Sequence, residues 1–116
     1  GRTYAVTDAS FYNLGEITKK RNLPLRVIHT GAGSTVDNAD IVGYTCLEQD
    51  VLWHGYTGTL GVGDLLLFGN AGGYSIVSKP QFIRPNCPMY ALRADGGTQE
   101  IMRAETFEDV FDKFVF

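Results

Sequence analysis

DIVGYTCLEQDVLWH, residues 40 to 54, is the stretch that decides the fold of this chain. Two runs rich in β-branched and aromatic residues, 40–45 and 50–54, flank a short connection. Runs of this kind, bounded by turn residues, are typical of β-strands. The same pattern recurs on both sides, and the sequence predicts strands over residues 3–8, 24–29, 40–45, 50–54, 64–68, 74–78 and 89–93.

The connections between these runs are rich in glycine. The chain contains 14 glycines, with clusters at residues 31–34 and 70–73. Glycine suits tight turns because it adopts positive φ at little cost. Asp95-Gly96 lies between two strand-like runs, and this dipeptide favours a β-hairpin with a type I′ turn.

The C-terminal segment changes period. Apolar residues from Phe107 to Phe114 recur at i, i+3, i+4 and i+7, which places them on one helical face. Thr106 at the N-cap and Asp109 three residues later form a capping box. The sequence therefore predicts a mainly all-β fold that forms one domain over residues 1–116. We expect a Greek-key β-barrel or sandwich whose short C-terminal helix covers one edge.

Composition excludes several classes of protein. The chain has 116 residues, of which 44% are hydrophobic and 20% are charged. This is ordinary globular usage and argues against disorder. A net charge of −3 argues against nucleic acid as a partner, because phosphate binding needs clustered Lys and Arg. No apolar run is long enough to span a membrane, and no signal peptide opens the chain. With only two cysteines, Cys46 and Cys87, a reduced, cytoplasmic protein is expected.

The residues by themselves indicate no chemistry. His29 and His54 each lie in a strand-like run without a second ligand at metal spacing, so no metal site is predicted. No serine lies in a nucleophile elbow, and no glycine-rich segment has the phosphate-loop pattern. Composition and spacing alone predict a soluble β domain without an assigned activity.

Four segments in order resemble the alanine-racemase-fold decarboxylases, which include diaminopimelate, ornithine and carboxynorspermidine decarboxylases. GYTCLEQDVL, residues 43–52, is similar to the family's Gly-x-x-Cys-x-x-x-Asp-Val-Leu segment. Residues 63–82 resemble its Gly-Asp strand, Gly-Ala-Tyr turn and Phe-Asn element in that order. IMRAETFED, residues 101–109, resembles the family's Arg-Arg-Glu-Thr-Tyr-Glu-Asp ending. YAVTDAS, residues 4–10, resembles the family's strand with the pattern Val-Asp-x-Gly.

This resemblance implies the C-terminal β domain of a decarboxylase that uses pyridoxal 5′-phosphate. Cys46 matches the family's cysteine that reaches across a homodimer interface into the partner subunit's active site. A thiol there suits proton delivery to the carbon that has lost carbon dioxide. The alternative is a buried free cysteine of the core. Cys87 matches no family cysteine.

The resemblance implies four further site residues. Tyr74 matches the tyrosine that hydrogen-bonds the cofactor phosphate, and Phe82 an aromatic that shields the amino-acid substrate from water. Asp50 matches an aspartate that makes an interface ion pair or contacts a substrate amine. Asp8 matches an aspartate near the distal end of the substrate. Core packing is the alternative for both aromatic residues, and a solvated or capping carboxylate is the alternative for both aspartates.

The departures from the family pattern bear on substrate and activity. Leu47 follows Cys46, where diaminopimelate and ornithine decarboxylases carry an acid for the distal amine, so this chain looks nearer to carboxynorspermidine and siderophore-pathway relatives. Ile83 replaces the asparagine after Phe82. The distal-carboxylate arginine is also absent. We expect the chain to be inactive without a cofactor-binding barrel domain, because no lysine matches the Schiff-base lysine; the lysines are Lys19, Lys20, Lys79 and Lys113.

Two other functions remain open at this stage. A stand-alone β-barrel binding module explains the strands and glycines equally well and predicts a compact apolar pocket. A racemase shares the fold, but it uses a tyrosine base and lacks the Cys-x-x-x-Asp pattern of Cys46 and Asp50. The family's β domain also borrows a strand from the N-terminus of the full chain, so we expect an exposed sheet edge here and a tendency to pair edges.

Overall fold

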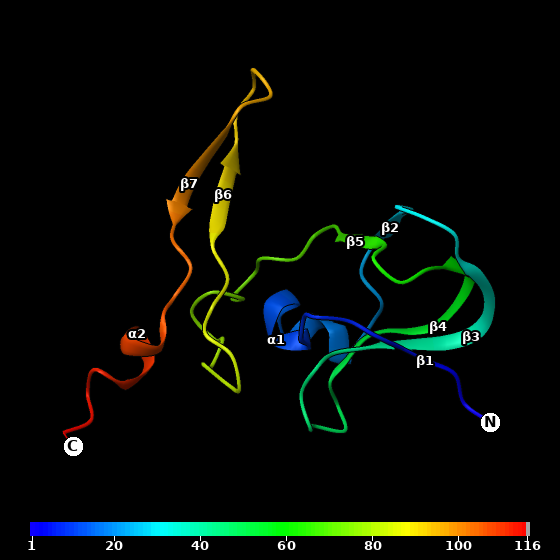
Figure 1. The fold of residues 1–116 in the computed structure, drawn as a ribbon, viewed down its shortest axis with the longest axis horizontal. Helices are drawn as coiled ribbons and strands as arrows, with labels where there is room; N and C mark the ends of the chain where they lie inside the picture. Colours follow the sequence, from blue (N-terminus) through cyan, green and yellow to red (C-terminus); the bar gives the residue numbers. More distant parts are fainter. Residues whose placement is uncertain (116) are drawn as a thin grey trace. The chain divides into compact units, whose positions relative to one another are not determined.

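The computed structural model describes residues 1–115 and divides into two compact units, residues 1–80 and the residues from Gln81 onward. Most regular structure is β-strand, as predicted, and the helices are short (Figure 1). The first unit carries β1 to β5 with two short helices, and the second carries β6, β7 and α2.

A three-stranded sheet forms the centre of the first unit. It contains β1 (Tyr4–Val6), β3 (Ser34–Val42) and β4 (Val51–Leu60) in the order β1-β3-β4. β1 runs parallel to β3, and β3 pairs antiparallel with β4. Both long strands extend further from their connecting loop than the sequence predicted. The β3–β4 ladder contains register shifts, which accommodate residues whose backbone conformation does not fit a regular strand. One of these residues is Asn38, which has a φ of 49°.

A second sheet pairs β2 (Leu25–Ile28) with β5 (Leu65–Phe68) in antiparallel register. The buried core of the unit lies between strands and helix, where residues far apart in sequence meet. Its central cluster is Leu14, Leu23, Ile41 and Leu52. Burial of such side chains is the main source of stability in a domain of this size.

Two short helices between β1 and β2 were not predicted. They are α1 (Phe11–Leu14) and the 3-10 helix η1 (Glu16–Lys19). Ser10 is the N-cap of α1: its Oγ accepts from the backbone N–H of Tyr12, and Asn13 Oδ1 accepts from the Ser10 N–H. The capping pattern was visible in the sequence, but a four-residue helix has too few residues to show the helical period.

The predicted strand over residues 74–78 is wrong. This segment forms a turn in which the N–H of Ser78 donates to the carbonyl of Tyr74. Tyr74 has a φ of 64°, a left-handed conformation that a strand residue does not adopt. The β-branched residues of the run predicted a strand, but the chain turns directly after Gly72 and Gly73.

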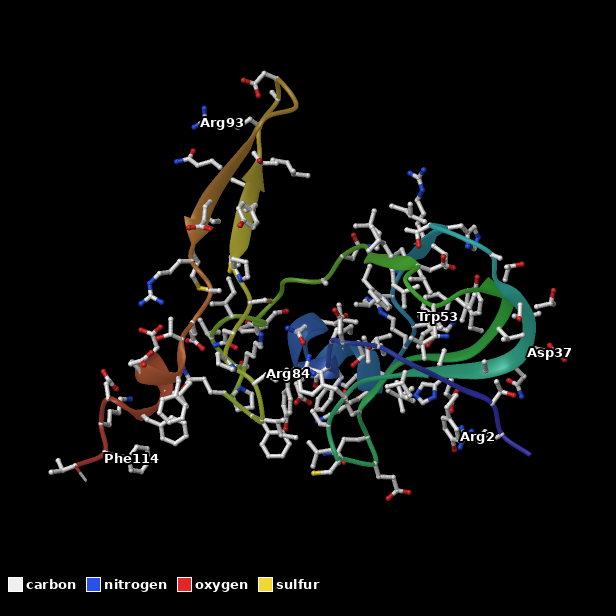
Figure 2. All side chains as sticks on the ribbon, viewed as in Figure 1. Arg2, Asp37, Trp53, Arg84, Arg93 and Phe114 are labelled. Carbon is white, nitrogen blue, oxygen red and sulfur yellow. The ribbon has the colours of Figure 1, made fainter. Side chains whose placement is uncertain are left out.

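In the second unit β6 (Met89–Leu92) and β7 (Thr98–Met102) form the predicted hairpin. The predicted type I′ turn is wrong, because neither Ala94 nor Asp95 has positive φ. Gly96, with a φ of 84°, donates to the carbonyl of Arg93, which gives a longer loop with glycine in the left-handed position. Arg93 directly follows β6 at the start of this loop (Figure 2).

Helix α2 (Phe107–Phe111) begins at the predicted capping box of Thr106 and Asp109. The rings of Phe107 and Phe111 stack with centroids 4.3 Å apart. Phe107 is 64% exposed, and the expectation that this helix covers a sheet edge stays a prediction. In this short helix the Phe107 ring packs against the Phe111 ring.

The strands do not close into a barrel within residues 1–115. They form three separate sheets, β1-β3-β4, β2-β5 and β6-β7. The Greek-key barrel or sandwich expected from the sequence therefore stays a prediction. The structure confirms that the chain is mainly β.

The α2 cap gives a pH-dependent prediction. The carboxylate of Asp109 accepts from Nη2 of Arg103 at 2.7 Å and from the N–H of Thr106 at 2.8 Å. The Arg103 hydrogen bonds hold the pKa of Asp109 well below its ordinary value of 3.8. Because the folded pKa is lowered, the pair stabilises the cap above the ordinary pKa, and this contribution is lost as pH falls through the lowered one.

We therefore expect Arg103→Gln to raise the pKa of Asp109 toward 3.8, as measured by NMR titration of the carboxyl group. Arg93→Gln is the matched control, because Arg93 pairs with Gln99 and leaves the cap untouched. An unchanged Asp109 titration in Arg103→Gln would contradict the assignment.

Candidate functional site

The loop between β3 and β4, residues 43–50, carries the cysteine predicted to be catalytic. Cys46 is exposed and forms no disulfide. The alternative of a buried core cysteine is therefore wrong. The loop is closed at its base by the N–H of Gly43, which donates to the Asp50 carbonyl at 2.9 Å. The strands on either side thus bring Cys46 to the tip of a short, closed turn.

Asp50 organises this loop from inside the protein. The residue is only 3% exposed. Its Oδ1 accepts from the Ser10 hydroxyl at 3.1 Å and from the Phe11 N–H at 2.7 Å. Its Oδ2 accepts from the N–H of Thr45 at 3.0 Å and from the Thr45 hydroxyl at 2.6 Å. A buried carboxylate is tolerated when its acceptor sites are filled in this way.

The interface ion pair or substrate contact expected for Asp50 stays a prediction beside this geometry. A carboxylate offers about four acceptor positions, and donors from the same chain use both oxygens twice. The structure therefore gives Asp50 a role within the chain, joining the β3–β4 loop to the start of α1.

The segment after β1 runs beside this loop. The N–H of Thr7 donates to the Val42 carbonyl at 2.9 Å, and the N–H of Tyr44 donates to the Ala9 carbonyl at 3.1 Å. Asp8, the predicted substrate residue, lies on this segment and is exposed. The structure thus brings the Asp8 segment and the Cys46 loop together through backbone hydrogen bonds.

The turn that carries Tyr74 is attached to the other end of α1. The hydroxyl of Ser75 donates to the Leu14 carbonyl at 3.1 Å. Gly15 has a φ of 97°, and a Cβ added there would lie 3.0 Å from Ser75 Oγ, so glycine is favoured at this position. Tyr74 itself is 82% exposed.

Helix α1 therefore lies between the loop that carries Cys46 and the turn that carries Tyr74. Asp50 binds its N-cap and first residue, Ser10 and Phe11, and Ser75 binds its last residue, Leu14. The helix has four residues and is little longer than a single α-helical turn. The helix that the sequence did not predict is the element that relates the Cys46 loop to the Tyr74 turn.

Phe82 belongs to the second unit and is half-buried there. It precedes Ile83, which has a φ of 68°, an uncommon conformation for a β-branched residue. The predicted shielding role of Phe82 remains a prediction.

A groove of about 870 Å³ opens in the first unit. One wall is the segment from Thr3 to Ala9, which includes β1, and the other runs from Leu60 to Leu66 at the start of β5. Asp8 and Asp64 are among its polar residues. Residues of β1 and β5, each an edge strand of its sheet, thus line the same mostly apolar groove.

The histidines pair with aspartates. His29 Nδ1 lies 2.8 Å from Asp64 Oδ2, and His54 Nδ1 lies 3.5 Å from Asp40 Oδ1. The hydrogen bond with His29 lowers the pKa of Asp64, assisted by the N–H of Thr30.

Residues 1–115 contain no group of three His, Cys, Asp or Glu side chains placed to hold a metal ion. None of their helices is long and apolar enough to cross a bilayer.

The residues of the Tyr74 turn fit one contact to pyridoxal phosphate. The phenol can donate a hydrogen bond to a phosphate oxygen without adding charge. Added Cβ atoms at Gly72 and Gly73 would meet nothing within 4 Å, so a ligand can approach the backbone closely there. The described part of this turn thus offers a phosphate donor in Tyr74.

Sequence reasoning missed the residues that hold the site together. Ser10, Gly43 and Thr45 all contact the Asp50 carboxylate or give it room. Ser10 carried a signal, because serine followed three residues later by Asn13 resembles a capping pattern. Gly43 was visible only as the first residue of the Gly-x-x-Cys segment, without a role, and Thr45 carried no signal, since only the fold brings a carboxylate into the loop.

Comparison with known proteins finds decarboxylases. No family profile matches the sequence. Carboxynorspermidine/carboxyspermidine decarboxylase of Herminiimonas arsenicoxydans is 28% identical over 113 residues, which is 94% of this chain and 29% of that protein. The chain thus spans less than a third of the length of the curated relative that it matches.

A solved structure shares the fold. Diaminopimelate decarboxylase from Helicobacter pylori, complexed with L-lysine, superposes with a TM-score of 0.79 at 21% identity, over 94% of this chain and 27% of that one. The solved structure thus shows the fold, and both similarities cover less than a third of the other protein's length.

Proposed function

We propose that this chain is the C-terminal β domain of a pyridoxal-phosphate-dependent amino-acid decarboxylase, inactive by itself and completed by a cofactor-binding barrel domain. The observation that carries the proposal is the exposed Cys46 thiol on a loop fixed by buried Asp50. That loop belongs to a sequence similar to a decarboxylase over 94% of its length. Amino-acid decarboxylation is the activity that best accounts for both.

Cys46 is the proposed proton donor. After carbon dioxide leaves, the substrate carbon holds an electron pair and needs a proton. The Cys46 S–H bond breaks, a C–H bond forms, and the resulting thiolate regains its proton from solvent. General acid catalysis of this kind needs a donor within hydrogen-bond reach of the accepting atom. An exposed thiol at a loop tip can reach an atom beyond its own domain, which supports a site shared with a homodimer partner subunit.

Tyr74 is the proposed cofactor contact. When bound, pyridoxal phosphate supplies an electron sink for the bond that breaks. The role of Tyr74 is to donate a hydrogen bond to the phosphate from a turn anchored to α1 by Ser75. The left-handed backbone of Tyr74 supports this role, since strained residues gather at ligand-binding turns.

Asp8 and Phe82 are the proposed substrate contacts. Asp8 is exposed on the segment beside the Cys46 loop, where its carboxylate can bind a distal amine. Phe82 would limit access of water to the substrate. Leu47 follows Cys46 with an apolar side chain, which favours a carboxylated polyamine over lysine-like or ornithine-like substrates.

The barrel fold and the dimer are part of the same proposal. The edge strands β1 and β5 both contribute residues to one mostly apolar groove, and a strand from outside residues 1–115 would close it. We propose a cytoplasmic homodimer in which this closure is complete.

The complete gene product that contains this chain tests the proposal. We expect it to show the visible absorbance of protein-bound pyridoxal phosphate. We also expect it to release carbon dioxide from carboxylated polyamines faster than from diaminopimelate or ornithine. The chain of residues 1–116 serves as the control and should release none, because it offers no lysine in a matching context.

Absence of bound cofactor, with no barrel encoded beside this chain, would overturn the proposal. That result would favour a β domain that binds small apolar ligands in the groove. Release that is fastest from diaminopimelate would overturn only the substrate assignment.

A further inference from the structure

We propose that Asp50 is a positioning residue, whose buried carboxylate fixes the loop that carries the Cys46 thiol. This inference rests on the proposed proton-donor role of Cys46. It assigns Asp50, Ser10 and Thr45 to one hydrogen-bonded clamp that contacts neither substrate nor cofactor and acts through the cysteine.

The clamp joins two segments that are far apart in sequence. The Ser10 hydroxyl and the Phe11 N–H, at the start of α1, donate to one oxygen of Asp50. Both donors of Thr45, the residue next to Cys46, are bound to the other oxygen. One carboxylate thus connects the loop directly to the helix.

Backbone contacts hold the loop on both sides of Cys46. The N–H of Tyr44 donates to the Ala9 carbonyl at 3.1 Å. The N–H of Leu47 donates to the Thr45 hydroxyl at 3.3 Å, so the same hydroxyl serves both Asp50 and the residue after the cysteine. Loss of the Thr45 hydroxyl therefore removes two contacts of the loop at once.

Gly43 provides the space for this carboxylate. An added Cβ there would lie 2.5 Å from Asp50 Cγ and closer still to both oxygens. The φ of Gly43 is not in the left-handed range, so the space, rather than the backbone conformation, requires glycine. The loop sequence is thus fitted to a carboxylate beneath it.

A fixed loop matters because proton transfer depends on distance. A displacement of about 1 Å at a catalytic group can cost about 100-fold in rate. An exposed loop without internal anchors samples many conformations. A satisfied buried carboxylate restricts it, and residues that lock a catalytic group in this way are needed for precise geometry.

Hydrogen exchange tests the clamp in the chain itself. We expect Thr45→Val and Asp50→Asn to accelerate amide exchange in residues 43–49 by about tenfold or more, because each removes hydrogen bonds that keep the loop closed. Exchange in β2 and β5 should stay unchanged. Thr57→Val is the matched control, because its hydroxyl donates to Asp37 on the exposed surface, away from the loop.

Steady-state kinetics of the complete gene product test the action through Cys46. We expect Thr45→Val to lower kcat for carbon dioxide release about 10- to 100-fold, with KM changed less than about threefold. In a Cys46→Ala background the same substitution should cause no further loss, because the positioned group is gone.

The outcomes separate the two proposals. A loosened loop with wild-type kcat in Thr45→Val, while Cys46→Ala is impaired, would overturn the positioning role and keep the proposed function. Wild-type exchange in both clamp variants would overturn the clamp. Wild-type kcat in Cys46→Ala would overturn the proton-donor role itself, while the exchange rates still report whether Asp50 holds the loop. If Asp50→Asn does not fold, Thr45→Val carries the test by itself.

Discussion

Cys46→Ala in the complete gene product is expected to lower kcat for carbon dioxide release by about 10²- to 10⁴-fold, the usual contribution of a positioned general acid. The substitution removes the only thiol on the β3–β4 loop and leaves the loop's hydrogen bonds intact, because Asp50 binds Thr45 rather than the cysteine. Cofactor absorbance should be unchanged. Initial rates of carbon dioxide release with each substrate measure the effect.

Cys87→Ala is the matched control for this prediction. Cys87 is also exposed and forms no disulfide. It lies in the second unit, outside the loop, and its removal should leave kcat within about twofold. A Cys46→Ala variant with the same rate as Cys87→Ala would show that the thiol donates no proton.

Gly43→Ala is expected to lower the free energy of unfolding by about 2 to 4 kcal/mol, a large effect for a single methyl group. The new Cβ would collide with the carboxylate of Asp50, which is buried and bound on both oxygens. Asp50 would have to move, and the donors from Ser10, Phe11 and Thr45 would lose their acceptor. Urea denaturation of the chain measures the loss.

Gly31→Ala controls for the general effect of replacing glycine. A Cβ at Gly31 would meet nothing within 4 Å, and its φ is not left-handed. Alanine at such a position changes stability by less than about 1 kcal/mol, usually favourably, because it restricts the unfolded chain. Equal midpoints for the two variants would contradict the packing of Asp50 beneath the loop.

The structure also explains why some sequence predictions failed. The residue pattern of 74–78 is that of a strand, but Tyr74 adopts a left-handed conformation after Gly72 and Gly73, and the chain turns. The Asp95-Gly96 hairpin was predicted, whereas its turn type depended on where the flanking strands stopped pairing. Local patterns predict that a chain turns more reliably than how it turns.

The sequence by itself determined the strand-rich character, the β6–β7 hairpin and the capping box of α2, because these depend on neighbouring residues. Motif order likewise indicated the decarboxylase fold family, and Cys46 and Tyr74 as its candidate site residues. Only the tertiary structure decided the role of Asp50, because its partners Ser10 and Phe11 lie about 40 positions away in sequence. From sequence alone a carboxylate is expected on the surface. Folding buries Asp50 among hydrogen-bond donors, and no local sequence pattern specifies which residues supply them.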